Sequence, residues 1–517
     1  MGVEAELAQP FGDFTALVAR HARERPAHPA VIHGESALGF GELDARIDRI
    51  AATLQREDVA PCDAIAICAA DCIEYVALFL GALRAGVAVA PIAPSLTPAA
   101  IANMAVDSGA RFLFVDAAAD AALGARATPP RIRLDDEAAL ESWLVPRDRA
   151  PRPVAMAPGW PFNIIYSSGT TGEPKGIVQP HAMRWLHVQR AVQYGYGPDA
   201  ITLISTPLYS NTTLVAALPT VALGGTLVLM GKFDPAAFLA LAERHRATHA
   251  MLVPVQYQRI MALPDFGRHD LTSFRVKFST SAPFAAAMKR DVLARWPGGL
   301  VEFYGMTEGG GTCVLVAHQH PQKLHTVGQP APGHEIRVID DAGRELPPGT
   351  TGEVVGHSAA MMTGYHNRPA QSREAEWFDA AGRRYIRTGD VGRFDADGFL
   401  VLVDRKKDMV ISGGFNIYPG DIEAVAREHP AVAEVAVVGV PSERWGETPV
   451  AFVVPRDAAA FDAAEVLEWC NARLGKMQRL AAVERVESLP RSGIGKVLKR
   501  ELRERYAGRA GGGEPPR

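Results

Sequence analysis

Through about residue 310 the chain alternates short apolar runs with longer segments of helical periodicity, and this alternation most restricts the possible folds. The runs expected to form buried strands are residues 63–70, 111–116, 226–230, 250–255, 275–280 and 300–303. After the first of these runs Asp71 can cap a helix, which we expect to end at Gly86. Strands that alternate with helices predict an α/β fold with largely parallel sheets.

The pattern changes after about residue 325. Residues 330–403 contain short runs separated by Gly, Pro and Asp, which predicts a barrel-like antiparallel subdomain. A charged cluster at 404–408 marks a domain boundary, and mixed helix and strand follow it, with strands expected at 435–440 and 450–454. We therefore predict a large N-terminal domain (1–403), a small mobile α+β C-terminal domain (404–507) and a Gly/Pro-rich disordered tail (508–517).

Composition excludes several classes of partner. The chain has 517 residues, of which 48% are hydrophobic and 22% charged, and its net charge is −4. No overall basic field favours nucleic acid, and no apolar run has the ~18 residues that an integral membrane helix needs. Residues 1–10 lack a basic-then-apolar start, so we expect no secretory signal.

The five cysteines are scattered, which argues against a disulfide framework and for a reducing, cytoplasmic location. Cys68 and Cys72 are spaced for a shared metal, but no histidine pair stands near them in sequence, and buried thiols are the better interpretation.

A loop of glycines and hydroxyl residues carries the strongest chemical signal. It runs from Tyr166 to Gly176 after the apolar stretch 163–165. Such a loop offers many backbone N–H donors with little steric bulk, which is what a polyphosphate requires. It does not match the Walker pattern, because Lys175 follows Pro174 and precedes Gly176. The alternative is a flexible surface loop.

This loop resembles the signature of the adenylate-forming (AMP-binding) enzymes of the acyl- and aryl-CoA synthetase type. Further segments resemble that family's motifs in the same order along about residues 15–505. They are Tyr304-Gly305-Met306-Thr307-Glu308, Thr388-Gly389-Asp390, Asp404-Arg405 with Gly413-Gly414-Phe415-Asn416, and Pro490-Arg491-Ser492-Gly493-Ile494-Gly495-Lys496.

The resemblance implies a two-step reaction. A carboxylate attacks the α-phosphate of ATP and releases pyrophosphate, and a thiol then displaces AMP. Lys496 is the implied catalytic cation, Thr307 a donor to the α-phosphate, and Glu308 the Mg²⁺ ligand, since hard cations prefer carboxylate oxygen. Without the family, Lys496 would be read as a solvated surface lysine. The implied ATP- and AMP-binding residues are Ser167, Ser168, Gly169, Thr170, Thr171, Gly172, Lys175, Ser281, Ala282, Pro283, Tyr304, Gly305, Met306, Asp390 and Arg405.

Domain alternation is also implied, because Lys496 must leave the site before a thiol can enter. Asp404 matches the family's hinge, and Gly413 and Gly414 match the backbone of its CoA tunnel, where side chains would block pantetheine. Asp390 and Arg405 match the pair that binds the two ribose hydroxyls. The alternative for the two glycines is an ordinary turn.

The acyl pocket departs from the family pattern. Ser210 stands where a histidine is frequent, Thr280 replaces a glycine that leaves room for an aryl ring, and three glycines, 309–311, leave a pocket wall without side chains. The predicted pocket residues are Tyr209, Asn211, Thr212, Thr280, Gly309 and Gly310. The polar members can bind a substrate hydroxyl or a second carboxyl, or equally satisfy backbone groups. No Arg or Lys is evident in these segments, which disfavours dicarboxylic acids.

Together these motifs predict an AMP-forming acid–CoA ligase that uses ATP, Mg²⁺ and coenzyme A. An aromatic acid (benzoate- or hydroxycinnamate-like) is slightly favoured over a medium- or long-chain fatty acid. Transfer of the acyl group to a separate carrier protein or to an amine is an alternative to coenzyme A. The sequence also leaves open whether the protein forms a homodimer and whether Lys496 is acetylated. A non-catalytic nucleotide-binding protein is disfavoured by the intact set of Thr307, Glu308, Asp390 and Lys496.

Overall fold

The computed structural model describes residues 3–167, 174–412, 415–442, 444–476, 478–492 and 495–509. The chain divides into two compact units, one formed by 1–335 with 356–386 and the other by 336–355 with 387–517. Each unit is described by itself. The domain boundary predicted at residue 404 stays a prediction. It was placed at a hinge, which is defined by motion, whereas the two units are defined by contacts within one structure.

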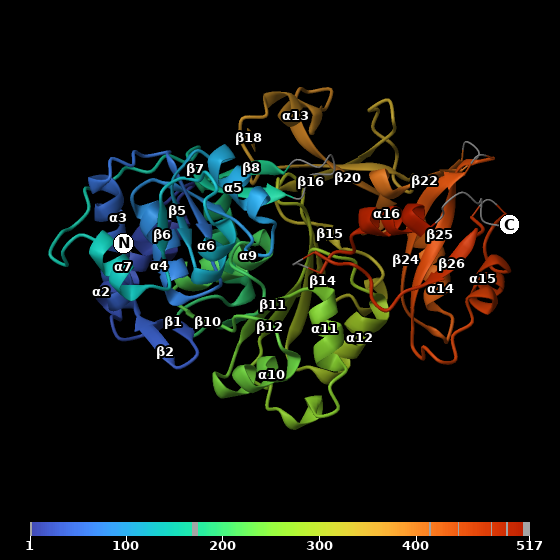
Figure 1. The fold of residues 1–517 in the computed structure, drawn as a ribbon, viewed down its shortest axis with the longest axis horizontal. Helices are drawn as coiled ribbons and strands as arrows, with labels where there is room; N and C mark the ends of the chain where they lie inside the picture. The colour runs from blue at the N-terminus through green and yellow to red at the C-terminus, as the bar shows by residue number, and fades with distance from the viewer. Residues whose placement is uncertain are drawn as a thin grey trace. The chain divides into compact units, whose positions relative to one another are not determined.

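Two sheets with helices form the N-terminal unit, which confirms the predicted α/β class (Figure 1). One sheet has the order β18-β8-β7-β4-β3-β5-β6, and its strands from β7 to β6 pair in parallel. Its strands are β3 (Ala64–Cys68), β4 (Ala88–Pro91), β5 (Ala110–Val115), β6 (Arg131–Arg133), β7 (Pro161–Ser167), β8 (Lys175–Pro180) and β18 (Gly364–Tyr365).

The second sheet has the order β15-β14-β13-β12-β11-β9-β10-β1-β2 and is parallel from β13 to β1. Its strands are β1 (Pro29–His33), β2 (Ser36–Gly39), β9 (Ile201–Ile204), β10 (Thr226–Leu229), β11 (His249–Leu252), β12 (Val276–Ser279), β13 (Gly299–Tyr304), β14 (Cys313–Val316) and β15 (Gln329–Pro330).

Helices cover these two sheets. They are α1 (Val3–Leu7), α2 (Phe14–Glu24), α3 (Phe40–Arg56), α4 (Ile73–Arg84), α5 (Pro98–Asp107), α6 (Ala117–Leu123), α7 (Glu137–Trp143), α8 (His181–Ala191), α9 (Asn211–Ala222), α10 (Pro235–Arg244), α11 (Pro254–Met261), α12 (Ala286–Arg295) and α13 (Pro369–Glu374). Helices α4 and α9 are apolar on nearly all sides and share one buried cluster with strands of both sheets, so they form the centre of this unit.

Two expected boundaries were wrong. The helix after β3 is capped by Cys72, whose Sγ accepts a hydrogen bond from Tyr75 N at 3.4 Å. Asp71 instead accepts from Leu208 N at 2.9 Å. The strand expected at 250–255 ends at Leu252, because Pro254 takes the first position of helix α11, where its missing N–H costs nothing.

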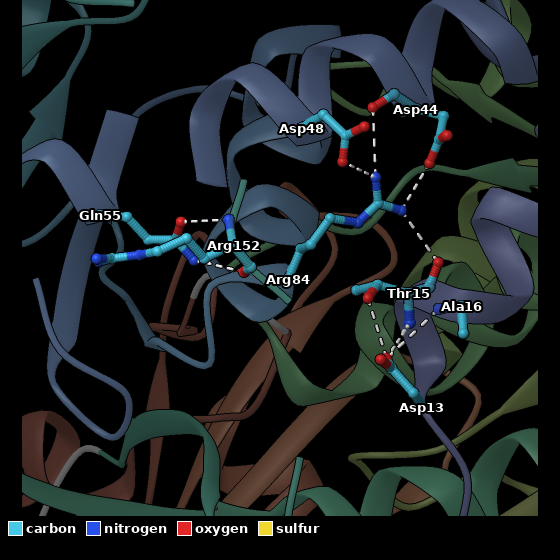
Figure 2. A network of polar contacts seen from close by, with 8 residues as sticks. All are labelled: Asp13, Thr15, Ala16, Asp44, Asp48, Gln55, Arg84 and Arg152. Atoms are coloured by element: carbon cyan, nitrogen blue, oxygen red, sulfur yellow. Dashed lines mark hydrogen bonds and ion pairs between the residues drawn. The ribbon is translucent and has the colours of Figure 1, made fainter. Parts of the chain in front are cut away.

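A network around Arg84 joins the first long helices of this unit (Figure 2). Arg84 lies at the end of α4 and donates to Asp44 and Asp48 of α3, each at 2.6 Å, and to the carbonyl of Thr15 in α2 at 3.1 Å. Asp13 caps α2 by accepting from Thr15 N at 2.8 Å. One guanidinium therefore holds three helices in register.

The predicted antiparallel subdomain forms a sheet of order β16-β17-β20-β19, with β21 paired to β20. Its strands are β16 (His334–Ile339), β17 (Gly352–Ser358), β19 (Glu376–Phe378), β20 (Arg384–Phe394) and β21 (Leu400–Arg405).

The last sheet, β23-β22-β25-β24 with β26 beside β25, belongs to the C-terminal unit. Its elements are β22 (Val410–Ser412), β23 (Phe415–Ile417), α14 (Pro419–Arg427), β24 (Val432–Ser442), β25 (Gly446–Pro455), α15 (Ala463–Asn471), β26 (Ala482–Arg485) and α16 (Lys499–Arg509). Helix α16 takes in the first two residues of the predicted tail, and the remaining residues, 510–517, lie outside the described part of the chain. Among the described residues no helix is long and apolar enough to cross a membrane.

Candidate active site

The segment after β13 carries two of the predicted catalytic residues. Tyr304 ends this strand and is 8% exposed, while Thr307 and Glu308 follow it and are half-buried. The carbonyl of Thr307 accepts from Gln179 Nε2 at 2.6 Å, and the carbonyl of Glu308 accepts from Met362 N at 2.8 Å. These two hydrogen bonds hold the main chain of Thr307 and Glu308 in place without using their side chains.

Glu308 has a partner that the sequence did not reveal. Its Oε1 accepts a hydrogen bond from Tyr365 Oη at 2.9 Å, and Lys175 Nζ lies 5.1 Å from the centroid of the same ring. Burial and the neighbouring carboxylate raise the pKa of Tyr365, so its hydroxyl stays a donor. Oε2 of Glu308 has no hydrogen-bond or ion-pair partner among the described residues, which suits a carboxylate that binds a hard cation.

Gly309 and Gly310 do not leave open room in a pocket wall. Both have positive φ, and a Cβ on Gly309 would lie 2.1 Å from the carbonyl oxygen of Ala360. A Cβ on Gly310 would lie 2.7 Å from the carbonyl oxygen of Gly356. The space in the Cβ direction of each glycine is filled by another backbone segment, and glycine is required for that close approach, while their place in the pocket wall stays a prediction.

The other predicted pocket residues gather around the start of α9. Ser210 caps this helix by accepting from Thr212 N at 3.2 Å, and Thr212 Oγ1 lies 2.6 Å from Ser281 Oγ. Tyr209 and Thr280 are half-buried. The polar set is thus partly used in mutual hydrogen bonds.

An arginine from outside the predicted pocket segments lies against this set. Arg184 on α8 donates from Nη2 to Asn211 Oδ1 at 2.9 Å. One feature of the sequence could have indicated this role: Arg184 lies on the same buried face of α8 as Val188 and Ala191, and charged residues are rare on such a face. Arg184 follows the phosphate loop, far in sequence from the segments predicted to form the pocket.

Only part of the predicted phosphate loop can be placed. The backbones of Ser167 and Lys175 pair across β7 and β8. Ser168, Gly169, Thr170, Thr171 and Gly172 lie outside the described residues. Of the other predicted nucleotide contacts in this unit, Gly305 and Pro283 are exposed, while Met306, Ser281 and Ala282 are half-buried.

The predicted ribose pair lies in the C-terminal unit. Asp390 of β20 and Arg405 of β21 are cross-strand neighbours, and Arg405 Nε lies 3.0 Å from Asp390 Oδ1. The sheet register therefore places a carboxylate acceptor beside a guanidinium donor, as recognition of two adjacent hydroxyls requires.

Lys496 is exposed on a small turn of the same unit. Its backbone N donates to Ser492 Oγ at 3.2 Å, its carbonyl accepts from Ser492 N at 2.8 Å, and Arg491 pairs with Val497 across the turn. Arg491 Nη1 also donates to the carbonyl of Gly495 at 2.8 Å. These bonds hold the turn on which Lys496 lies.

The predicted hinge residue is tied to the element that follows it. Asp404 Oδ2 accepts from Gly420 N and Oδ1 from Arg405 N, both at 2.7 Å. Gly413 and Gly414, the predicted tunnel residues, lie outside the described part of the chain.

Cys68 and Cys72 are free thiols, and burial raises the pKa of each to about 12. Within the described residues no group of three or more His, Cys, Asp or Glu is arranged for a metal ion.

A two-part chain with a loop of glycines and hydroxyl residues, an acidic segment after β13 and a lysine on a turn of the second unit resembles an adenylate-forming enzyme. Two family profiles match it: "AMP-binding enzyme" over residues 18–366 and "AMP-binding enzyme C-terminal domain" over residues 421–496. The chain belongs to the AMP-binding enzyme family, as the resemblance of its motifs implied.

Relatives match it along almost their whole length. It is 34% identical to a feruloyl-CoA synthase of Amycolatopsis sp (94% of this chain, 98% of the relative) and 33% identical to an indoleacetate–CoA ligase of Aromatoleum aromaticum (96% and 98%). A fatty acid–[acyl-carrier-protein] ligase, ScoC, of Streptomyces coeruleorubidus is 32% identical (94% and 95%).

Among solved structures, ATP-bound MatB from Rhodopseudomonas palustris superposes with a TM-score of 0.85 at 30% identity, over 95% of this chain and 98% of that one. The predictions of fold class and of an AMP-forming acid–thiol ligase are confirmed at the level of class.

Proposed function

We propose that this chain is an ATP- and Mg²⁺-dependent ligase that joins an aromatic carboxylic acid to coenzyme A through an acyl-adenylate. The observation that carries the proposal is the arrangement of Glu308, Tyr365 and Lys175. Tyr365 donates from its hydroxyl to the carboxylate of Glu308, and the ammonium group of Lys175 lies over the face of the same ring, so a carboxylate and a cation both contact one tyrosine. This is a charge distribution suited to a metal-bound polyphosphate.

In the first step the acid's carboxylate oxygen attacks the α-phosphorus of ATP, and pyrophosphate leaves. Negative charge grows on the phosphoryl oxygens, and Lys496 and Thr307 stabilise it by charge and by hydrogen bonding. Glu308 would hold Mg²⁺ through its unpaired Oε2, and the metal would neutralise phosphate charge. Lys175 would neutralise charge on the phosphate loop side.

In the second step the thiol of coenzyme A attacks the acyl carbonyl, and AMP leaves. Asp390 and Arg405 hold the ribose during both steps, with the carboxylate accepting from one hydroxyl and the guanidinium donating to the other. The role of Gly413 and Gly414 in the entry of pantetheine stays a prediction from the sequence, because both lie outside the described residues. Cytoplasmic location and a homodimer remain predictions from the sequence.

The choice of an aromatic acid is supported by two relatives named for aryl-substituted acids, feruloyl-CoA synthase and indoleacetate–CoA ligase. The polar groups around α9 also suit a substituted ring better than an alkyl chain. The second candidate is transfer to a carrier protein, which the similarity to the fatty acid–[acyl-carrier-protein] ligase favours.

Pyrophosphate release from ATP, measured with and without coenzyme A over aromatic, fatty and dicarboxylic acids, tests the proposal. Release that accelerates with coenzyme A for aryl acids supports it. Release that coenzyme A does not accelerate would favour a carrier-protein or amine acceptor, and acceleration for fatty acids alone would overturn the choice of acid.

A further inference from the structure

Arg184 is a buried cation whose described neighbours are all neutral. Its side chain lies on α8 and is 1% exposed, and burial lowers its pKa to about 9. Nε donates to Asn163 Oδ1 at 3.1 Å, and Nη2 donates to Gln179 Oε1 and to Asn211 Oδ1. No carboxylate forms an ion pair with it in the part of the chain that the structure describes.

These four residues, which we name the Arg184 cluster, leave an excess positive charge inside the protein. Buried charges are normally paired, because an isolated ion in a low-dielectric interior is costly. Amide oxygens solvate the guanidinium but do not cancel its charge. A nearby anion or strong hydrogen-bond acceptor would therefore stabilise the positive charge of the cluster.

The guanidinium also fixes how Asn211 presents its amide. A guanidinium only donates, so Asn211 must turn its oxygen toward Arg184, and that oxygen accepts a second hydrogen bond from Gln179 Nε2 at 3.2 Å. Asn211 Nδ2 therefore faces the other way. It donates to no described residue and is not an enclosed atom, and Asn211 is half-buried at the first turn of α9.

The cluster is connected to the predicted catalytic segment. Gln179 uses its other N–H to bind the carbonyl of Thr307 at 2.6 Å. Asn211 is one of the residues predicted to line the acyl pocket, and Thr212 beside it binds Ser281. The free donor of Asn211 thus lies where the acyl group is expected, and the N-terminal N–H groups of α9 add to the positive potential.

We propose that Asn211 Nδ2, oriented and polarised by Arg184, binds an anionic oxygen on the acyl part of the substrate. The acid would carry a second carboxylate on its ring or side chain in addition to the one that is activated. This inference rests on the proposed ligase function and deepens it. Asn211 is the group that touches the substrate, and Arg184 is a positioning residue that acts through it.

The variant Asn211→Asp tests this directly. Aspartate keeps an oxygen for Arg184 and Gln179, and so preserves the internal bonds, but it replaces the outward NH₂ donor by an acceptor. The probes are two aryl acids that differ only in one ring substituent, a carboxylate or a methyl group. Calorimetry measures the Kd of each acid with ATP analogue present, and pyrophosphate release measures kcat/KM.

Wild type is expected to prefer the carboxylate-bearing acid at least about tenfold in Kd and in kcat/KM, and N211D should lose that preference. Gln258→Glu is the control: it adds the same charge at an exposed position of α11 and should leave the preference unchanged. Arg184→Met should weaken binding of the carboxylate-bearing acid in the same way, and thermal melting checks that this variant folds. If it does not fold, the result with N211D alone decides whether the proposal holds.

Equal effects of N211D on both acids, or a wild type without preference, would overturn the proposal and leave the cluster a structural one. Because Kd is measured without turnover, the two proposals can fail separately. Selective binding of the carboxylate-bearing acid without coenzyme A-dependent release of pyrophosphate would contradict only the proposed ligase function.

Discussion

In the proposed mechanism the first half-reaction depends most on the positive charge of Lys496. Lys496 is an exposed residue, and the bonds that Ser492 and Arg491 make across its turn use the main chain of Lys496 and Gly495, so Lys496→Ala keeps these bonds. We expect Lys496→Ala to slow adenylate formation at least ~10²-fold, as loss of a charge-stabilising group does. Thioesterification of a supplied acyl-adenylate should stay nearly unchanged, and both rates can be followed in single-turnover assays.

Lys476→Ala is the matched control, since it removes an exposed lysine of the same unit that no predicted motif contains. An equal loss in both half-reactions of K496A would contradict the account in which this lysine serves only adenylation.

Asp71 should give the protein a pH-dependent stability. Its carboxyl accepts from Leu208 N, and burial raises its pKa to about 6, above the ~3.9 of an unfolded chain. The folded state therefore binds the proton more tightly, and stability falls as the pH rises from about 4 through about 6. Asp71→Asn keeps the acceptor and has no charge to bury.

We expect D71N to match wild type near pH 4 and to exceed it by up to about 2–3 kcal/mol above pH 7. Urea unfolding at several pH values measures this difference. Parallel stability curves for the two proteins would show that Asp71 is solvated in the folded state.

Residue roles that depend on local motifs could be predicted, whereas roles that depend on tertiary contacts could not. Asp390 and Arg405 were matched by motif, and the strand register then put them side by side. Tyr365 and Arg184 were missed because their partners are far away in sequence. Lys289 reads as a surface residue of α12, yet it is 1% exposed and pairs with buried Glu302.

At the scale of elements, the six parallel strands that were predicted as apolar runs were found within three residues at each end, whereas β1, β4, β6 and β9 were not predicted. The ends of the predicted strands were less certain: β11 stops early where Pro254 starts a helix. The approach of the 309–310 turn to the backbone at 356–361 could not be foreseen, since it depends on how two distant loops meet.

That approach predicts a large effect of one methyl group. In Gly309→Ala the new Cβ would lie 2.1 Å from the carbonyl of Ala360 in a residue with φ of +74°. We expect a loss of at least about 3 kcal/mol in the free energy of unfolding, from strain and from the displaced loop. Gly197→Ala, where nothing lies within 4 Å of the new Cβ, should change stability by less than about 1 kcal/mol. Equal melting temperatures for the two variants would show that the loops separate at little cost.

At the scale of the whole molecule, alternation between two half-reactions requires a hinge, and we propose Asp404. Its carboxylate binds Gly420 N and Arg405 N, so it ties the end of β21 to the start of α14. Asp404→Pro removes both acceptors and fixes φ. We expect the ratio of the adenylation rate to the thioesterification rate to change at least about tenfold, because one of the two arrangements becomes inaccessible.

Single-turnover rates of each half-reaction measure this ratio, with Asp457→Pro in the loop between β25 and α15 as a control for proline insertion in the same unit. An unchanged ratio in D404P would place the hinge elsewhere. The sequence placed the domain boundary at the charged cluster 404–408, and this boundary stays a prediction. The assignment of 336–355 to the same unit as 387–517 was not foreseen, because it depends on contacts between segments that are distant in sequence.

The Arg84 network of Figure 2 has a consequence for how the N-terminal unit opens. One guanidinium at the end of α4 binds two carboxylates of α3 and the carbonyl of Thr15 in α2, so separating α3 from α4 breaks two ion pairs and releasing α2 removes one acceptor of Arg84. Their amide protons should therefore exchange with deuterium as one cooperative group, with a common free energy of opening. Helices α2, α3 and α4 would then open and close together as one cooperative unit.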